Sequence, residues 1–241
     1  MLIKTEAIVL RTVKYGDNKV IVDMFTADCG RMSFVASAGR SGKGGVRRQL
    51  FLPMALLEIE ADVRPRMKLQ KLRAVRLAYP MATVPFEPVK LSLALFLSEF
   101  LCHALRGEQE NRPLFEYISG GVQWLDNSVG RYANFHLVFL MRLSLFLGFY
   151  PNLDGYREGC GFDLRAGCFC AAVPSHGDYL SPDEARRIGV LMRMTLSTMH
   201  LYKMSRAERN RFIEVLVSYY RIHIPDFPEL RSLAVLRELF V

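Results

Sequence analysis

The first 80 residues alternate between apolar and polar positions in short runs, as β-strands do. Five such runs are present, at residues 3–15, 19–26, 31–38, 51–61 and 68–79. Turn-forming residues separate the first three runs, with "GDN" after Tyr15 and "ADCG" after Thr26. Short strands joined by tight turns, with one long loop, are typical of a small antiparallel barrel. We therefore predict that residues 1–80 form a β-barrel domain.

From about residue 81 the apolar residues recur at helical spacing. Five runs follow this period, at residues 87–107, 131–148, 181–196, 205–224 and 228–240. Ser181 with Glu184, and Ser205 with Glu208, have the spacing of capping boxes, in which each side chain bonds to the backbone N–H of the other residue. The second run is apolar on most sides, which predicts a buried central helix. We therefore predict that residues 81–241 form an all-α helical domain.

Residues 150–180 interrupt the helical pattern. This segment contains glycine, proline, cysteine and aromatic residues and shows no helical period. We predict a loop-rich insertion with room for a short hairpin. The fold class expected for the whole chain is α+β, with an N-terminal β-barrel followed by the helical domain and its insertion.

The composition indicates a soluble protein of a reducing compartment. The 241 residues are 51% hydrophobic, which is enough to bury a substantial core in one or two domains. Five cysteines form an odd set without dense spacing, so a secreted disulfide framework is not expected. The most lipid-like run, residues 137–150, is too short to span a bilayer and contains Arg142. We expect a cytoplasmic location and no membrane partner.

The positive charge is concentrated in one segment. The whole chain carries a formal charge of +8, and residues 31–76 contain eleven cations and three acids, an excess of the same size. A basic balance of this kind indicates an anionic partner and says nothing about the fold. The rest of the chain is neutral, so this segment is the expected contact surface.

The loop "GRSGKGGVRRQL", residues 39–50, holds four glycines, four cations and no acid. It is not a Walker A phosphate loop, because that motif needs a glycine five residues before the Gly-Lys pair and a hydroxyl residue directly after the lysine. Here Ser37 and Gly44 occupy those positions. A flexible linker is one interpretation of the loop. We favour contact with a phosphate backbone, since glycines permit close approach and arginines match phosphate oxygens.

The run "RPRMKLQKLRAVR", residues 64–76, is also dense in cations and free of acids. A charged strand often serves only to keep the edge of a sheet solvated. Small barrels also present a strand face and its flanking loops to nucleic acid, and we favour this second interpretation. Four aromatic residues nearby are candidates either for stacking on bases or for the core, namely Tyr15, Phe25, Phe34 and Phe51.

Cys160, Cys168 and Cys170, together with His176, are weak candidates for a zinc site in the insertion. Structural zinc sites use paired ligands at Cys-x2–4-Cys spacing, and the gaps between these cysteines differ from that pattern. We interpret the three as reduced thiols and expect neither a metal nor another cofactor.

Catalytic patterns are sparse. No nucleophile, base and oxyanion donor come together in the sequence, so we expect a protein that is not an enzyme. A metal-dependent nuclease built on Asp17, Asp23 and Asp28 is an alternative. Against it, Asp17 and Asp28 fall at predicted turns, where aspartate is common because its side chain bonds to the local backbone.

Two stretches resemble the RecO family of bacterial recombination mediators, "KYGDNKVIVDMFTADCGRMSFVASAGRS" (14–41) and "LFLPMALLEIEADVRPRMKLQKLRAV" (50–75). The features in common are Tyr15-Gly16 followed by Asp17, Phe25-Thr26, Gly30 at the next strand, and Gly39-Arg40-Ser41. The helical remainder and the insertion also match the family's layout. The resemblance implies that the barrel is an OB-fold (oligonucleotide-binding fold). It also implies a degenerate zinc-finger-like insertion, because the two Cys-x-x-Cys pairs of many members are absent.

The resemblance implies a function as well. RecO proteins bind single- and double-stranded DNA without sequence preference and anneal complementary strands. In DNA repair they act with RecR to load RecA on DNA coated by single-strand binding protein (SSB), whose acidic C-terminal tail they contact. A nucleoid-associated protein is therefore expected. The residues expected to bind DNA are the cations of the loop and the strand, namely Arg40, Lys43, Arg47, Arg48, Arg66, Lys68, Lys71 and Arg73. From composition alone, an OB-fold RNA-binding protein is the alternative.

An acidic and hydrophobic SSB tail needs an apolar groove with a cation at its rim. The candidates are four arginines on the predicted helices, Arg142, Arg206, Arg209 and Arg211. They are chosen by residue type alone, and ordinary surface or helix-packing arginines are the other interpretation.

Overall fold

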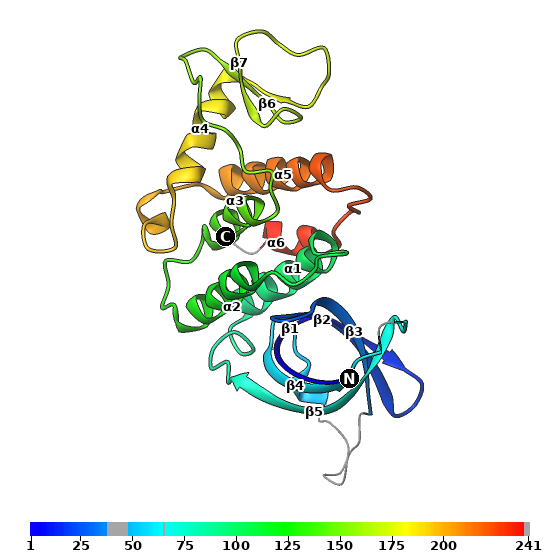
Figure 1. Cartoon of the computed structure of the whole chain (residues 1–241). Coiled ribbons are helices and arrows are strands. Elements are labelled where there is room, and N and C mark those ends of the chain that lie inside the picture. Colours follow the sequence, from blue (N-terminus) through cyan, green and yellow to red (C-terminus); the bar gives the residue numbers. More distant parts are fainter. Residues whose placement is uncertain (38–47, 65, 239–241) are drawn as a thin grey trace. The chain divides into compact units, whose positions relative to one another are not determined.

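The computed structural model describes residues 1–37, 48–64 and 66–238 (Figure 1). The chain divides into two compact units. The first holds Met1–Ser128 and helix α6 (Ser232–Glu238), and the second holds Val129–Glu229. Compactness therefore groups the first two helices with the barrel, whereas the change in sequence pattern lies near residue 81. The domain boundaries 1–80 and 81–241 follow that pattern and stay a prediction.

Five strands close the barrel of the first unit (Figure 1). They are β1 (Leu2–Tyr15), β2 (Lys19–Thr26), β3 (Gly30–Ser37), β4 (Leu56–Asp62) and β5 (Leu69–Tyr79). Their order around the barrel is β1-β2-β3-β5-β4, and it closes because β4 pairs with both β5 and β1. All neighbours are antiparallel except β3 and β5, which are parallel. This five-stranded closed barrel is OB-like, so the predicted barrel and the α+β class are confirmed.

Alternate residues of the strands fill the barrel. In β2 and β3 the even-numbered positions point inward, so Val20, Val22 and Phe34 are buried while Lys19 and Ser37 are exposed. The alternation seen in the sequence is thus the alternation between core and surface. Each fully buried Val or Phe contributes roughly 1.5–3 kcal/mol through the hydrophobic effect.

The fourth strand begins later than the sequence pattern predicts. Residues 51–55 form a turn rather than the start of the predicted strand 51–61, and Met54 has a φ of 63°. The backbone N–H of Met54 donates to the carbonyl of Val9 at 2.9 Å, and that of Ala55 donates to the carbonyl of Leu52 at 3.0 Å. Phe51 and Ala55 are nevertheless buried in the barrel core. Their apolar character reflects packing, which the pattern alone does not separate from strand structure.

Helices α1 (Pro88–Ala104) and α2 (Arg112–Asn127) pack on the barrel. The Ser98 hydroxyl donates to the carbonyl of Leu10, and the rings of Phe25 and Phe115 have centroids 6.2 Å apart. The start of β3 also contacts the connection between these two helices. Gly30 has a φ of +68°, and a Cβ atom there would clash with the backbone of Glu108 and Gln109. Only glycine fits this contact, which helps to hold the barrel on the helices.

Helix α2 was not among the predicted helices. Gly120 and Gly121 near its middle weaken the helical signal, because glycine costs about 1 kcal/mol relative to alanine in a helix. The sequence nevertheless contains a residue type that favours the start of a helix. Asn111 is the N-cap and its side chain accepts a hydrogen bond from the backbone N–H of Leu114 at 3.2 Å.

A buried aspartate of α2 ties that helix to the end of β5 and to the connection between β5 and α1. The Asp126 carboxylate accepts hydrogen bonds from the backbone N–H groups of Ala82, Thr83 and Val84 at 2.8–2.9 Å. It also accepts one from the Tyr79 hydroxyl at 3.0 Å. Asp126 is only 1% exposed. We call these five residues the Asp126 junction, because one side chain satisfies the backbone of the connection between barrel and helices.

The second unit is built from α3 (Phe135–Phe146), α4 (Pro182–Arg193), α5 (Arg206–His223) and a small sheet. The sheet has the order β7-β6-β8, with β6 (Gly161–Asp163), β7 (Cys168–Cys170) and β8 (Tyr179–Leu180). Strands β6 and β7 form the short hairpin for which the predicted insertion left room. Helix α3 is buried on most sides, as its sequence indicates.

One of the two predicted capping boxes is formed. Ser205 accepts from the backbone N–H of Glu208 at 3.2 Å, and the Glu208 carboxylate accepts from the backbone N–H of Ser205 at 2.8 Å. The box at Ser181 was wrong, although Ser181 is the N-cap of α4. Its hydroxyl makes no bond to the helix backbone and instead donates to the Glu184 carboxylate at 3.4 Å. The same carboxylate accepts from Arg211 at 2.6 Å, so it is shared between the cap and an ion pair to another helix.

Candidate nucleic-acid interface

A groove with cations at its rim lies on the outer surface of the barrel. Its volume is about 470 Å³. It is lined by residues from β2, β3, the end of β4, the β4–β5 loop and β5, namely Lys19, Val35, Ser37, Asp62, Arg64, Met67, Leu69, Gln70, Lys71 and Leu72. We call it the cationic groove, because Lys19, Arg64 and Lys71 outnumber Asp62. Barrels of this class bind oligonucleotides on the face of strands 2 and 3 and on the loops beside it.

Strand register brings the groove cations together. Lys19 of β2 lies opposite Ser37 of β3, and Lys71 of β5 lies opposite Val35 of β3. Residues directly opposite each other project to the same face of a sheet. Lys19 and Lys71, which are 52 positions apart in sequence, therefore flank the same end of β3. The start of β5 and the β1–β2 hairpin lie on the same side of the barrel (Figure 1).

Gln70 holds the β4–β5 loop in shape. Its side chain is buried, accepts from the backbone N–H of Arg64 at 2.8 Å and donates to the carbonyl of Arg64 at 3.1 Å. The backbone N–H of Met67 also bonds to the carbonyl of Arg64 at 3.0 Å. A buried amide that meets its hydrogen-bonding needs within one loop fixes that loop. Arg64, Arg66 and Lys68 therefore extend from a defined turn beside the groove.

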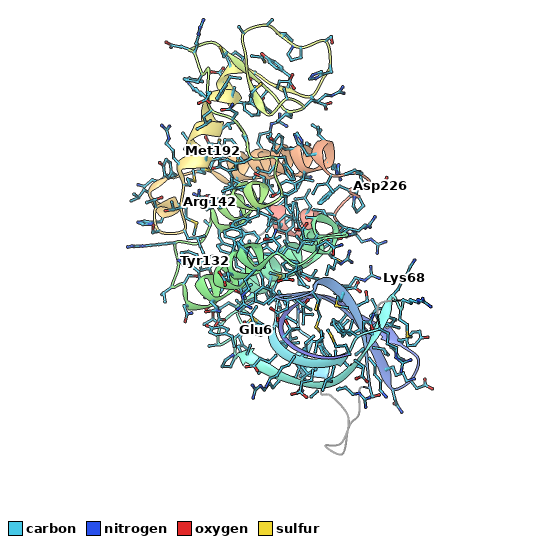
Figure 2. The ribbon with its side chains drawn as sticks, in the orientation of Figure 1. Glu6, Lys68, Tyr132, Arg142, Met192 and Asp226 are labelled. Carbon is cyan, nitrogen blue, oxygen red and sulfur yellow. The ribbon has the colours of Figure 1, made fainter. Side chains whose placement is uncertain are left out.

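The predicted DNA-binding residues fall into three groups. Lys71 lines the groove. Arg66 and Lys68 are exposed on the β4–β5 loop, which contributes Arg64 and Met67 to the groove lining, and Lys68 is labelled in Figure 2. Arg73 is exposed on β5, but its Nε and Nη2 atoms both lie 2.5 Å from the Asp62 carboxylate. The remaining predictions lie outside the described residues, namely Arg40, Lys43, Arg47 and the side chain of Arg48.

The prediction missed two cations that line the groove. Lys19 lies outside the basic segment 31–76, and Arg64 was not selected although it lies inside that segment. The signal for Lys19 was the turn "GDN", since a tight β1–β2 turn places the next residue at the end of the barrel. Residues 38–47, which lie outside the described residues, follow Ser37 in the sequence, and Ser37 is the last residue of β3 and lines the groove.

Asp62 lowers the net positive charge of the cationic groove, so its replacement by a neutral residue is expected to strengthen DNA binding. Its carboxylate lies opposite Lys71 in the strand register and pairs with Arg73. Asp62→Asn removes one charge that repels phosphate and releases one guanidinium. We expect DNA affinity to rise about threefold to tenfold at 0.1 M salt, and the salt slope to steepen by about one phosphate contact. Fluorescence anisotropy with a labelled oligonucleotide across a salt series measures both.

The control for Asp62→Asn is Glu58→Gln. Glu58 pairs with Arg76 on the same strand β5, away from the groove. Releasing Arg76 is expected to leave DNA affinity within twofold of the unmodified protein. Weaker or unchanged binding by Asp62→Asn would show that Arg73 and Lys71 make no phosphate contact.

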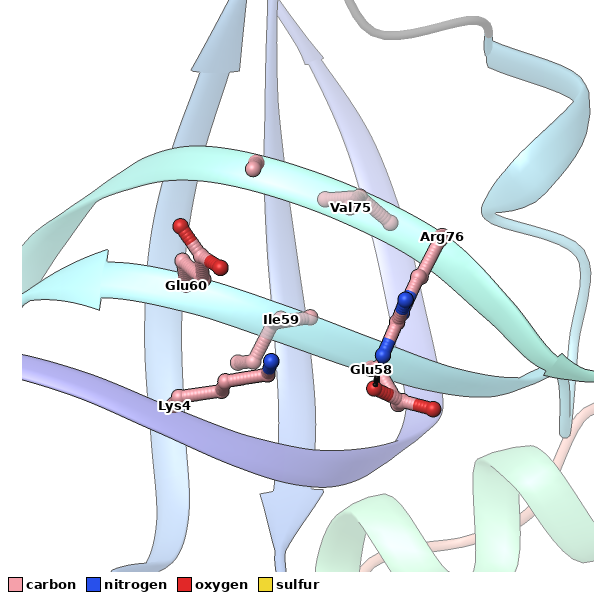
Figure 3. A pocket seen from close by; sticks show the side chains of 7 residues that line it. Lys4, Glu58, Ile59, Glu60, Val75 and Arg76 are labelled. Atoms are coloured by element: carbon pink, nitrogen blue, oxygen red, sulfur yellow. Dashed lines mark hydrogen bonds and ion pairs between the residues drawn. The ribbon is translucent and has the colours of Figure 1, made fainter.

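A second hollow on the barrel contrasts with the groove (Figure 3). It measures about 130 Å³ and is lined by Lys4, Glu58, Glu60 and Arg76 among others. Glu58 accepts from Arg76, and Lys4 lies opposite Glu60 in the register of β1 and β4. Its cations are balanced by neighbouring carboxylates. It is therefore a poor surface for phosphate and a useful internal control.

The candidate zinc ligands lie around the small sheet of the second unit. Cys160 is buried beside β6, and Cys168 and Cys170 are half-buried at the two ends of β7. Burial raises the pKa of the Cys170 thiol, and neighbouring Asp163 and Cys168 raise it further. His176 pairs with Asp163 at 3.3 Å. Within the described part of the chain, no three His, Cys, Asp or Glu side chains come close enough together to hold a metal ion.

The three aspartates considered for a metal-dependent nuclease do not lie together in one site. Asp17 lies in the turn before β2, Asp28 lies in the turn after it, and eight residues of strand separate the two turns. At about 3.3 Å per residue, the turns are roughly 26 Å apart. Asp23 lies between them and accepts from the Ser33 hydroxyl at 2.5 Å. The shared carboxylate site that a nuclease needs is therefore not formed by these residues.

Comparison with known families agrees with this architecture. The family model described as "Recombination protein O N terminal" matches residues 1–81. The model described as "Recombination protein O C terminal" matches residues 85–234. The chain belongs to the RecO family.

RecO relatives match this chain over its whole length. Proteins named "DNA repair protein RecO" from Phocaeicola vulgatus and Bacteroides fragilis are 52% and 50% identical to it over 240 and 241 residues. A protein of the same name from Porphyromonas gingivalis is 34% identical over 244 residues. All three alignments cover 100% of both chains. The family resemblance read from the sequence is therefore confirmed, and DNA repair and recombination are the processes of this RecO family.

The candidate tail-binding arginines differ in environment. Arg142 is exposed on α3 (Figure 2), and Leu145 one turn later is 50% exposed. Arg211 is paired with Glu184 at 2.6 Å, and this hydrogen bond raises the pKa of its guanidinium. Arg209 is half-buried and donates to a backbone carbonyl, and Arg206 is exposed in the first turn of α5. By this geometry Arg142 is the best placed for an external carboxylate.

Among the described residues, no helix combines the length and the apolar character needed to cross a bilayer.

Proposed function

We propose that this RecO-family protein binds single- and double-stranded DNA without sequence preference and anneals complementary strands. The observation that carries the proposal is the cationic groove at the oligonucleotide-binding face of an OB-like barrel. Lys19, Arg64 and Lys71 line it, and Arg66 and Lys68 extend beside it. Lysine and arginine contact phosphates, which every DNA sequence presents alike, so binding of this kind is insensitive to sequence.

Annealing follows from the same electrostatics. Two complementary strands repel each other through their phosphates, and a basic surface that holds both lowers this repulsion. The predicted residues Arg40, Lys43, Arg47 and Arg48 belong to the segment that follows Ser37 at the groove edge, so we include them in the proposed DNA contact. Binding through released counterions weakens steeply as salt rises.

The test is annealing of two complementary oligonucleotides across a salt series. We expect the protein to raise the annealing rate at least tenfold at 0.05 M salt and to lose most of this effect by 0.3 M salt. A rate equal to that of the free oligonucleotides at low salt would refute the proposed annealing activity. Competition with RNA of the same sequence tests the alternative, because an OB-fold RNA-binding protein would prefer the RNA.

We further propose that the protein acts with RecR and with SSB to load RecA on SSB-coated single strands. Family membership supports this proposal, and the exposed Arg142 supplies a cation for the acidic SSB tail. Repeating the annealing measurement on SSB-coated strands, with and without RecR, tests it. Annealing restricted to bare strands would contradict the part of the proposal that concerns SSB.

A peptide titration tests the arginine itself. Arg142→Ala is expected to lower the affinity for a labelled peptide of the acidic SSB C-terminus at least fivefold, because an exposed guanidinium pairs with carboxylates. Arg211→Ala is the matched control, since Glu184 already occupies its guanidinium. Equal affinities for the unmodified protein and both variants would remove these arginines from the tail site.

A further inference from the structure

Tyr15 is the one exposed aromatic side chain among the described residues of the barrel. It is 52% exposed, whereas Phe25, Phe34 and Phe51 are at most 4% exposed and belong to the interior. Tyr79 is half-buried and donates to Asp126. Of the aromatic candidates in the sequence, only Tyr15 therefore has a ring that a ligand can reach.

The ring of Tyr15 lies beside the cationic groove. In the β1–β2 hairpin Tyr15 is directly opposite Lys19, a residue that lines the groove. Opposite residues of an antiparallel pair project to the same face, with Cβ atoms roughly 5 Å apart. This separation suits a contact with one base and a phosphate of the same nucleotide. Val13, two residues earlier on this face, is 40% exposed and extends the apolar surface.

Apolar side chains continue from this ring into the groove. Met67 is 49% exposed, and Val35 and Leu69 are half-buried. All three line the groove between its cations. A duplex presents mainly phosphates, since its base faces are covered by neighbouring pairs. A single strand also presents base faces, which stack on aromatic side chains in barrels of this class.

We propose that Tyr15 stacks on an unpaired base of a DNA strand whose phosphates are held by Lys19 and Lys71. The inference rests on the proposed function and deepens it. The cations hold either form of DNA, and Tyr15 makes the groove favour single-stranded over double-stranded DNA.

Replacement of the ring tests the proposal. Tyr15→Ala is expected to lower the affinity for a single-stranded oligonucleotide about tenfold, as expected for loss of a base–aromatic stack. Affinity for the duplex of the same sequence is expected to stay within twofold. The salt slope for the single strand is expected to stay the same, because no charge is removed. Tyr15→Phe keeps the ring and is expected to bind like the unmodified protein.

Phe86→Ala is the matched control. Phe86 is 78% exposed in the segment between β5 and α1, in the same unit as Tyr15 but outside the groove lining. Its loss is expected to change neither affinity. A second measurement uses the unmodified protein with oligonucleotides that carry abasic sites. We expect abasic strands to bind about tenfold more weakly than intact strands, and Tyr15→Ala not to distinguish the two.

Three results would overturn the inference. They are equal losses for single strands and duplex in Tyr15→Ala, no loss for either, or indifference of the unmodified protein to abasic sites. Failure of the proposed function has a different signature. It would appear as negligible binding of both single-stranded and double-stranded DNA by the unmodified protein.

Discussion

Removing the three groove cations together, by Lys19→Ala, Arg64→Ala and Lys71→Ala, is expected to lower affinity for single-stranded DNA about 100-fold at 0.1 M salt. Each phosphate contact contributes about 0.7 to the slope of log affinity against log salt for a single strand. Three lost contacts therefore reduce the slope by about 2. Since counterion release vanishes near 1 M salt, this slope corresponds to about two decades of affinity at 0.1 M salt.

The fold is expected to tolerate this triple change. All three side chains are exposed. The bonds that hold Arg64 in its loop use its backbone, which alanine keeps. Surface substitutions away from structural contacts usually change the free energy of unfolding by less than about 0.5 kcal/mol each. Anisotropy measures the affinity, and urea unfolding checks the fold.

The matched control removes cations from the other hollow of the barrel. Lys4→Ala with Arg76→Ala takes away two exposed charges that neighbouring carboxylates already balance. We expect affinity within threefold of the unmodified protein. Full affinity in the groove variant, together with loss of affinity in Arg47→Glu with Arg48→Glu, would move the DNA contact from the groove to the glycine-rich segment.

Asp126→Ala is expected to lower the free energy of unfolding of the first unit by about 3–5 kcal/mol. The change leaves three backbone N–H groups, those of Ala82, Thr83 and Val84, without their acceptor. Each buried donor without a partner costs about 1–3 kcal/mol. Domains are usually stable by only about 5–15 kcal/mol, so this loss is a large share. Trp124 lies on α2 in the same unit, and its fluorescence during urea unfolding reports the change.

The Asp126 junction also predicts a dependence on pH. Burial opposes ionisation of the carboxylate, but the hydrogen bonds from Val84, Ala82 and Thr83 outweigh it and hold the pKa of Asp126 below its ordinary value. A carboxylate with a depressed pKa stabilises the folded state above its pKa in the unfolded chain, which is about 3.9. This stabilisation is lost as the pH falls through the lower, folded pKa. Asp126→Asn is expected to lack this part of the acid sensitivity and to be less destabilised than Asp126→Ala.

Asp28→Ala is the control for the junction. Asp28 is an aspartate of the same unit, but its side chain is 50% exposed and pairs with Arg112 at 3.3 Å. Exposed pairs contribute about 0–1 kcal/mol, so the unfolding free energy is expected to fall by no more than that. If Asp126→Ala and Asp28→Ala unfold at the same urea concentration, the junction does not support the fold as described.

The strands were predictable because their signal is local. Strand β2 has the bounds Lys19–Thr26 that the alternation predicts, since Val20, Val22 and Met24 alternate into the barrel core. The helix α2 was not predicted, because two glycines weaken its pattern and its stability depends on packing with Phe25 and on the Asp126 junction. The prediction of capping boxes was right for one helix and wrong for the other, because contacts with residues distant in sequence also decide where a glutamate side chain bonds. Glu208 completes a capping box, whereas Glu184 bonds to a distant arginine.

The groove was only partly predictable. The sequence showed a basic segment, and Arg66, Lys68 and Lys71 are indeed exposed at or beside the groove. It did not show that Arg73 is held by Asp62, because that contact depends on the pairing of β4 with β5. The prediction also omitted Lys19, which joins the basic segment only through the barrel.

By itself the sequence determined the α+β class, the five barrel strands and the family. It also determined the positions of the five predicted helices around an irregular insertion, although it missed α2. These follow from periodicity and from motifs, which are properties of neighbouring residues. Tertiary structure alone decided which cations share a surface, which aromatic ring is exposed and which carboxylate holds the connection between barrel and helices. Those outcomes depend on strand register and on the closure of the barrel, and closure brings together residues such as Lys19 and Lys71 that are far apart along the chain.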